Sequence, residues 1–242
     1  MITKQLFDII NNISDDLITE AANPHKRIKR IRISKVILIA AVMVTLLGFT
    51  AWAANMVIVS RTGHSSNIPD YYTVPTQATL LKDIGISMNV IDKFSNGYIF
   101  REASVGDNAD YGENGQCVEK FKSLICKYIF EDKDISVHID AAAAGTNLDD
   151  DKTAEVYKNT AIKYISYQNK IVPSDYKLTA EDEADKRSGR YVFSYGSDEV
   201  EIIDVQLIEF AYQGLNYSMC TFNNSLTRDA LVQMAREFID YQ

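Results

Sequence analysis

The sequence predicts an α+β protein: an N-terminal transmembrane helix, followed by a domain with a mostly antiparallel sheet and two packed helices. Three observations support this prediction. Residues 36–60 are a run of 25 residues without a charge, residues 79–242 alternate short apolar runs with turn residues, and parts of that region show helix signals. Strands in hairpin-like order, with helices separated from them, indicate an α+β fold.

The uncharged run Val36–Ser60 has the length of a membrane span. A bilayer core ~30 Å thick needs about 20 apolar residues in a helix, so this run crosses it with room for tilt. Six Lys and Arg lie at residues 26–35, whereas after the run Arg61 is followed by no cation until Lys82. Because cations beside a span are retained in the cytoplasm, we expect residues 1–35 inside and residues 61–242 outside the cell membrane.

Two other interpretations of the run remain open. Ala51-Trp52-Ala53 resembles the small-x-small site of a cleaved signal peptide. The run continues beyond that site, however, and a patterned segment of 35 residues precedes it. A buried core helix is the remaining alternative, although such a helix rarely lacks a polar face over this length.

The segment before the run contains one apolar stripe. Leu6, Ile10, Ile13 and Leu17 are spaced i, i+4, i+7 and i+11, which predicts a short amphipathic helix that ends before Pro24. Such a helix is marginal alone, so it implies a partner: a protein groove, a second copy or the membrane interface. Its acidic neighbours favour a protein. A partly ordered tail without a partner is the alternative.

Charge divides the chain and excludes one class of partner. Residues 1–35 have a net charge of +3, and residues 61–242 have a net charge of −11. A domain that acidic repels a phosphate backbone, so we expect no binding to nucleic acid. The three cysteines, Cys117, Cys126 and Cys220, cannot all pair within the chain. A Cys117–Cys126 disulfide is one reading, and small apolar side chains on strands are the other.

The outer domain is expected to begin after a polar linker, residues 61–78. A short helix at 79–84 ends at Gly85, and a final helix starts at Thr227 as N-cap, with Leu226 and Leu231 forming a hydrophobic staple. A third helix is predicted over 153–167 after an acidic lead. Strands are predicted at 98–105, 121–130, 135–141, 190–195, 199–211 and 216–222. In the strand 135–141, Ile135, Val137 and Ile139 are expected to point to one side and Ser136 and His138 to the other. Residues 106–115 and 173–188 read as loops.

No motif of known chemistry occurs in the sequence. Histidine is found only at His25, His64 and His138, none at motif spacing from a serine, cysteine or carboxylate. There is no Walker loop, dinucleotide fingerprint, HExxH or EF-hand pattern. We therefore assign no catalytic, cofactor-binding or metal-binding residue and expect no cofactor. The absence of motifs lowers the prior for an enzyme without excluding one.

The order of segments resembles an uncharacterised family of Firmicutes single-pass membrane proteins, described as anti-sigma-factor-like. The matching pieces are Ile13–Ile18, Phe94–Phe100, Val172–Tyr176, Ser194–Asp198, Tyr212–Phe222 and Leu226–Ile239. The resemblance implies a role in envelope-stress or sigma-factor regulation, with no known ligand. Well-studied anti-sigma factors use a larger cytosolic domain, often with a His/Cys zinc motif, which 35 residues do not supply.

Three functions follow as hypotheses. The first is a membrane-anchored regulator whose outer domain binds an unknown ligand and whose residues 1–22 engage a cytosolic protein such as a sigma factor. The second is an outer binding or structural module for which the span is only a tether. The third is a hydrolase acting on the cell wall, which requires a cleft with convergent carboxylates.

Overall fold

The computed structural model describes residues 58–66, 68–141 and 152–242, all within one compact unit of the chain. The apolar stripe Leu6, Ile10, Ile13 and Leu17, the basic segment and all but the last three residues of the predicted span lie outside the described residues. Among the described residues, no helix is both long enough and apolar enough to cross a bilayer.

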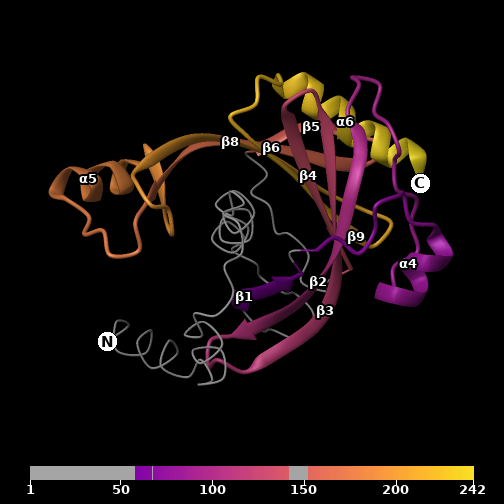
Figure 1. Cartoon of the computed structure of the whole chain (residues 1–242), viewed down its shortest axis with the longest axis horizontal. Helices are drawn as coiled ribbons and strands as arrows, with labels where there is room; N and C mark the ends of the chain where they lie inside the picture. The colour runs from indigo at the N-terminus through magenta and orange to yellow at the C-terminus, as the bar shows by residue number, and fades with distance from the viewer. Residues whose placement is uncertain (1–57, 67, 142–151) are drawn as a thin grey trace, which may run out of the picture. The chain divides into compact units, whose positions relative to one another are not determined.

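The described residues form nine strands and three helices (Figure 1). In chain order these are β1 (Ile58–Ser65), α4 (Gln77–Ile84), β2 (Ile99–Gly112), β3 (Cys117–Phe130), β4 (Lys133–Asp140), β5 (Thr153–Tyr157), β6 (Thr160–Val172), α5 (Ala180–Ser188), β7 (Tyr191–Tyr195), β8 (Glu201–Tyr212), β9 (Leu215–Phe222) and α6 (Arg228–Tyr241).

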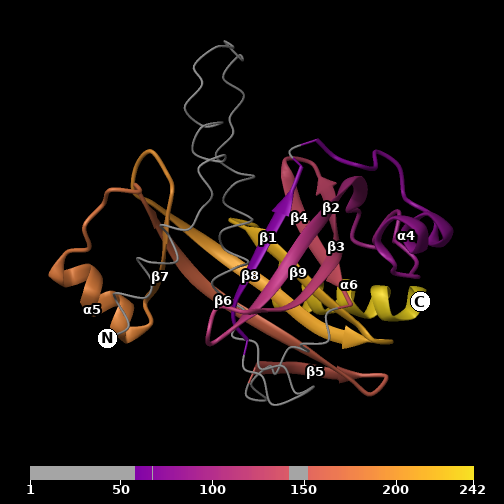
Figure 2. The same ribbon diagram turned by 90° about the horizontal axis from the view of Figure 1, so that it is seen from below.

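The strands form one curled sheet in the order β1-β2-β3-β4-β9-β8-β6-β5, and every neighbouring pair on this path is antiparallel (Figure 2). β7 is the exception, since it pairs in parallel with the C-terminal half of β6. The pairing of β4 with β9 joins the first four strands to the later ones. The predicted α+β class with a mostly antiparallel sheet is confirmed.

The predicted helix at 153–167 is wrong, because these residues form the hairpin β5–β6. Its turn is Lys158-Asn159, and both residues have positive φ, 46° and 64°. Two consecutive left-handed residues make the tight turn whose twist matches antiparallel strands. The apolar and β-branched residues on either side fit both a helix and a strand pattern, and the asparagine in the middle was the signal for the turn.

The two predicted loops also contain regular structure. Residues 106–112 extend β2, because their backbone pairs with β1 on one side and β3 on the other. Within 173–188, α5 begins after Thr179, which forms a capping box with Asp182. Threonine followed three residues later by an acidic residue is a start signal for a helix. The density of charge in this stretch had indicated a loop.

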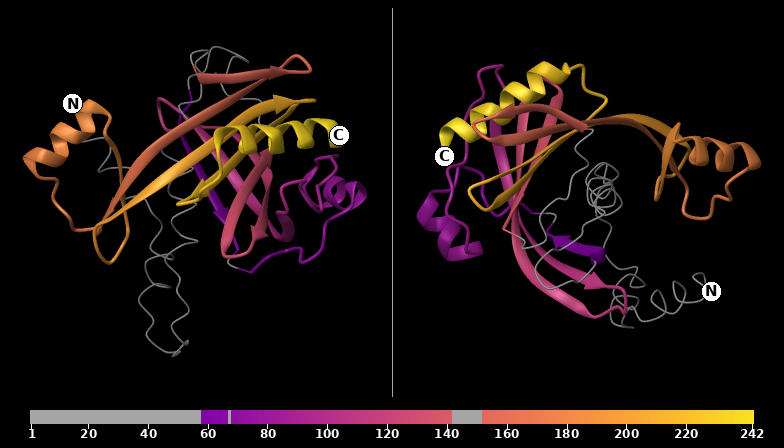
Figure 3. Two further views of the ribbon diagram at one scale, coloured as in Figure 1. Left: turned by 90° about the horizontal axis from the view of Figure 1, so that it is seen from above. Right: turned by 180° about the vertical axis from the view of Figure 1, so that it is seen from behind.

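The helices at 79–84 and after Thr227 are confirmed as α4 and α6. Gly85 ends α4 in the left-handed conformation, at φ 77°, and its N–H is bonded to the Leu81 carbonyl. The Thr227 hydroxyl accepts a hydrogen bond from the N–H of Ala230 at the start of α6. α6 then buries one apolar face against β5, β6 and β8 (Figure 3).

The hydrophobic core lies between one side of the sheet and the elements that cover it, which are helices α4 and α6 and the segment 71–100. Four aromatic rings meet at its centre, since Phe238 of α6 lies 5.4 Å from Phe94, 6.3 Å from Tyr128 and 5.7 Å from Tyr217. The predicted inward residues of β4, Ile135, Val137 and Ile139, are all fully buried here. We call this side of the sheet the core face and the opposite side the second face.

The start of β1 crosses the predicted boundary between span and linker. Ser60, the last residue of the predicted span, pairs with Tyr111, and residues 61–65 pair with β2 down to Gly106. The C-terminal end of the predicted linker holds the first residues of α4. The chain therefore enters the sheet directly where the uncharged run ends.

Candidate functional site

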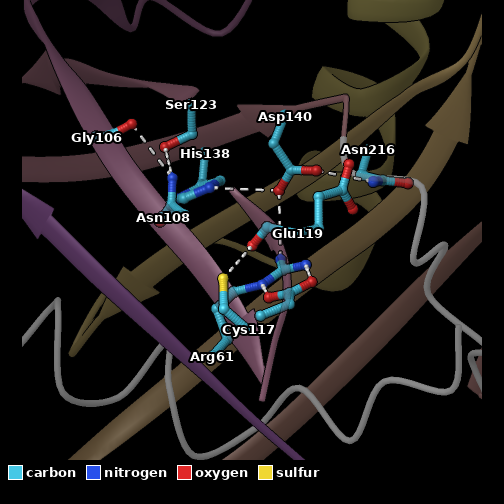
Figure 4. A network of polar contacts seen from close by, with 10 residues as sticks. Arg61, Gly106, Asn108, Cys117, Glu119, Ser123, His138, Asp140 and Asn216 are labelled. Atoms are coloured by element: carbon cyan, nitrogen blue, oxygen red, sulfur yellow. Dashed lines mark hydrogen bonds and ion pairs between the residues drawn. The ribbon is translucent and has the colours of Figure 1, made fainter. Parts of the chain in front are cut away.

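The second face carries charged and polar side chains that are buried. The group that we call the Arg61 cluster comprises Arg61, Asp110, Asp140, His138 and Asn216, drawn from β1, β2, β4 and β9 (Figure 4). Arg61 and Asp140 are buried and Asp110 is fully buried. Buried charges at this density are uncommon unless they are paired, because removal of an ion from water costs several kcal/mol.

Arg61 is the centre of the cluster. It donates two hydrogen bonds to the Asp110 carboxylate, from Nε to Oδ1 at 2.5 Å and from an Nη to Oδ2 at 2.8 Å. Its other Nη lies 3.5 Å from Oδ2 of Asp140. The guanidinium also lies 4.6 Å from the ring centre of Phe121. A planar guanidinium fits this arrangement because it can hold a carboxylate with two parallel bonds while it stacks on a ring.

The register of the sheet places these residues together. Arg61 is the direct cross-strand partner of Asp110, and Asp140 is the partner of Asn216. His138 precedes Asp140 by two residues, so both point to the second face. Its Nε2 lies 3.5 Å from the Asp140 carboxylate, whose Oδ1 accepts a hydrogen bond from the Asn216 amide at 2.8 Å. The cluster thus ties the edge strand β1 to three other strands.

Beside the Arg61 cluster lies a set of uncharged polar groups that are joined by hydrogen bonds. The side-chain amide of Asn108 donates to the Ser123 hydroxyl at 2.9 Å and to the Gly106 carbonyl. Gly106 lies so close to Ser123 that an added Cβ would meet its hydroxyl at 2.6 Å. Glycine therefore allows the approach of β2 and β3 that this hydrogen bond needs.

Glu209 of β8 is a third buried carboxylate on this face. Burial raises its pKa to about 7, and the charges of Lys163 and Lys152 act in the opposite direction. A carboxylate with such a pKa exchanges its proton near neutral pH. The residue is thus the most strongly perturbed acid of the described residues that keeps a pKa in the physiological range.

A separate polar network holds α5. Lys170 of β6 donates to Asp182 at 2.5 Å, and Tyr176 and the Thr179 backbone and hydroxyl donate to the same carboxylate. These donors, with Lys170 the foremost, lower the pKa of Asp182 well below its usual range. Every contact serves the helix start and its attachment to β6, so this network explains local structure.

The chemistry open to the Arg61 cluster is limited. A carboxylate whose oxygens are engaged by a guanidinium is poorly placed to exchange a proton with a substrate. Asp110 and Asp140 share one such partner. No group of three or more His, Cys, Asp or Glu in the described ranges is arranged to hold a metal. A hollow of about 480 Å³ lies nearby, between the end of α4 and strands β2 and β3, with Asn108 and Phe121 in its lining.

The residues singled out in the sequence are distributed as follows. The predicted partner-binding residues lie outside the described part of the chain, so the structure does not place them. His138 is on the polar side of β4, as predicted, and joins the Arg61 cluster. Cys126 and Cys220 are buried and free, whereas Cys117 is free and exposed. Cys117 is the first residue of β3, and Cys126 lies nine residues further along the same strand. In an extended strand this separation is roughly 30 Å, so the two cysteines cannot form a disulfide with each other.

Sequence reasoning missed Asp110, Asp140 and Glu209 as a set. Asp110 had been assigned to a loop, and the other two occur in strands whose partners were not known. The only available signal was a charged residue at an alternating position within an apolar strand. Residues that are far apart in the chain meet here through sheet register alone.

Comparisons with known proteins give no further assignment. No family model and no curated protein matches the sequence, and no solved structure matches the fold.

Proposed function

We propose that this chain is a membrane-anchored regulatory protein, in which the sheet domain lies outside the cell and binds a ligand or partner. The span lies within residues 36–57, since Ile58–Ser60 already belong to β1, and residues 1–22 engage a cytosolic protein such as an extracytoplasmic-function sigma factor. The chain needs no cofactor for this role.

The observation that supports the proposal is the attachment of β1. This strand begins at the end of the predicted span and is fixed to β2 by backbone pairing and by the buried Arg61–Asp110 pair. A change in the sheet that moves β1 therefore moves the point from which the chain leads back to the predicted span. Rigid strands and buried ion pairs transmit displacement better than a polar linker does.

A tethered binding or structural module is the second candidate. The same fold and the same Arg61 cluster serve that role, with the cluster acting only as a structural clasp. The two functions differ in what they require of residues 1–35, since only the regulator depends on the pattern of the inner helix.

The orientation is tested with a native probe. Cys117 is exposed, whereas Cys126 and Cys220 are buried, and burial also raises the thiol pKa of both. A membrane-impermeant maleimide added to intact cells is expected to label the wild-type chain and not Cys117→Ser. Labelling that needs cell lysis would contradict the proposed orientation.

The inner partner is tested by capture. Residues 1–35 immobilised on resin should retain a cytosolic protein, identified by mass spectrometry, and Leu6→Asp with Ile13→Asp should abolish its retention. The matched control is Asn11→Asp with Asn12→Asp, which adds the same two charges away from the apolar stripe. Equal retention by both double variants, or retention of nothing, would favour the tethered module.

A further inference from the structure

A row of polar side chains crosses the second face beside the Arg61 cluster. Lys163 on β6 is the cross-strand partner of Glu209 on β8, Glu209 is the partner of Ser218 on β9, and Ser218 is the partner of His138 on β4. Direct partners in a sheet point to the same side, so these four side chains form a continuous line over four strands. We call them the polar row.

The two charged residues of the polar row, Lys163 and Glu209, are buried and do not form an ion pair with each other. Lys163 is 5% exposed and Glu209 is 2% exposed. Opposite charges at directly paired positions normally form an ion pair, yet neither side chain makes a hydrogen bond or ion pair within the described part of the chain. Each of these charges has lost water without a hydrogen bond or an ion pair in exchange, which is costly.

Two hydroxyl groups nearby are also buried without a hydrogen-bond partner. The Ser218 hydroxyl in the polar row and the Tyr167 hydroxyl on β6 are buried and have no hydrogen-bond partner among the described residues. Burial raises the pKa of Tyr167, and the nearby Cys220 and Glu209 add to this shift, so the hydroxyl lies within the electrostatic range of Glu209. Native structures leave few buried polar atoms unsatisfied, so two such hydroxyls beside two charges without an ion pair point to this part of the face as a place where a polar ligand could bind.

An apolar strip runs beside the polar row on the same face. Ile165, Leu207 and Cys220 are direct partners in the next line across the sheet, and Val205 and Phe222 follow in the line beyond. With the buried Ile171 and Ile203 these side chains form a small second hydrophobic cluster, separate from the main core. The second face therefore offers a cation, an anion and the Ser218 hydroxyl in one line, with the Tyr167 hydroxyl and aliphatic surface alongside.

We propose that this part of the second face binds a free aliphatic α-amino acid: Lys163 receives its carboxylate, Glu209 receives its ammonium group, and the strip from Ile165 to Cys220 receives its side chain. A zwitterion supplies both missing partners at once, which a singly charged ligand cannot do. The unpaired hydroxyls of Ser218 and Tyr167 add hydrogen bonds to the same ligand. Charge-assisted hydrogen bonds to both ends make recognition specific for the free amino acid.

This inference rests on the proposed function, since it names the ligand of the outer domain. It also gives the ligand a physical connection to β1. His138, at one end of the polar row, contacts Asp140, and Asp140 contacts Arg61. An amino acid in the polar row thus lies at the end of a chain of contacts that reaches the strand next to the predicted span.

The test is calorimetric titration of the full chain, purified in detergent micelles, with L-alanine, L-valine and L-leucine, each in a separate experiment. Saturable binding of at least one is expected. For L-leucine, the analogues 4-methylpentanoate and 3-methylbutylamine each lack one of the two charges. Each should bind about tenfold more weakly or worse, as expected when a hydrogen bond to a buried charge is lost.

Two variants assign the charges. Glu209→Gln should weaken amino-acid binding and remove its advantage over 4-methylpentanoate, and Lys163→Met should remove the advantage over 3-methylbutylamine. The controls Glu201→Gln and Lys177→Met alter exposed side chains of the same types and should bind as the wild-type chain does. Thermal melting of each variant verifies that it is folded.

Absence of saturable binding for all three amino acids overturns the inference, as does equal binding of an amino acid and its singly charged analogues. Both readings use only the wild-type chain, so they hold even if a variant fails to fold. Neither outcome affects the proposed regulatory function, which is judged separately by Cys117 labelling and by capture on residues 1–35.

Discussion

The two faces of this sheet solve the problem of burial in different ways. The core face buries apolar side chains against α4 and α6, and four aromatic rings meet around Phe238. The second face buries charges and hydroxyls, some paired, as Arg61 and Asp110 are, and some unpaired, as Glu209 is. Apolar packing stabilises without regard to direction, whereas buried polar groups contribute only when each partner is present. The core face thus gives stability, and the second face holds the polar groups on which the proposed ligand site depends.

The largest effect is expected on the core face. Phe238→Ala removes a fully buried ring that contacts three other aromatic side chains. Loss of about 4 kcal/mol in the free energy of unfolding is expected, measured by chemical denaturation. Phe130→Ala is the matched control, since this ring is 43% exposed, and it should cost much less. Equal losses would show that the two positions do not differ in packing.

The second-face counterpart is Arg61→Met. It leaves Asp110 and Asp140 buried beside each other without their shared cation, so a loss of about 3 kcal/mol is expected. Adding Asp110→Leu to the same chain should recover most of the stability, because no unpaired charge then remains at that position. Arg190→Met, at an exposed ion pair with Asp185, should have no measurable effect. If the double variant is no more stable than Arg61→Met, the cluster acts through packing and not through charge.

A third prediction concerns pH and Glu209. The folded chain holds its proton up to about pH 7, whereas the unfolded chain releases it near the ordinary value of 4.5. Folding therefore binds a proton between these values, so this group makes stability fall as pH rises through the window, by about 3 kcal/mol in all. Glu209→Gln should be increasingly more stable than the wild-type chain from pH 4.5 to 7. A difference between the two chains that is independent of pH would contradict the assignment.

The smallest effect is expected from removal of the N-cap residues of α5 and α6, and the two helices should respond differently. Thr179→Ala removes the N-cap of α5, whose only buried residue is Asp182, and Thr227→Ala removes the N-cap of α6, which packs into the core. Each loss is about 1 kcal/mol. In α5 it should appear as faster hydrogen exchange of the helix amides with unchanged melting temperature, because the helix opens locally. In α6 it should lower the melting temperature of the whole domain.

Local signals predicted much of the fold. Gly85 as the end of α4, Thr227 as the start of α6 and the alternation of Ile135, Val137 and Ile139 each depend on residues within one or two turns of chain. The same kind of reasoning failed at 153–167, where apolar residues suit either period and only the Lys158-Asn159 turn decides. It failed again at α5, because a stretch this rich in charged residues suits an exposed loop as well as a surface helix, and the capping box of Thr179 and Asp182 decides for the helix.

The candidate site could not be predicted in this way. Arg61 and Asp110 are separated by 49 residues, and the polar row joins strands from both halves of the domain. Nothing in a strand's own sequence states which other strand will pair with it or in what register, because register is chosen by the burial of the whole face. Charged residues such as Asp140 and Glu209 therefore read as ordinary surface residues until the sheet is assembled.

The sequence by itself determined the uncharged run at 36–60, the charge difference on its two sides, the α+β class and the two helix boundaries at Gly85 and Thr227. These properties depend on composition or on neighbours along the chain. The tertiary structure alone decided that β4 pairs with β9, that Arg61 meets Asp110 and Asp140, and that Lys163 faces Glu209. Those contacts come from cross-strand register, which the cooperative packing of the core face selects and which the second face then inherits.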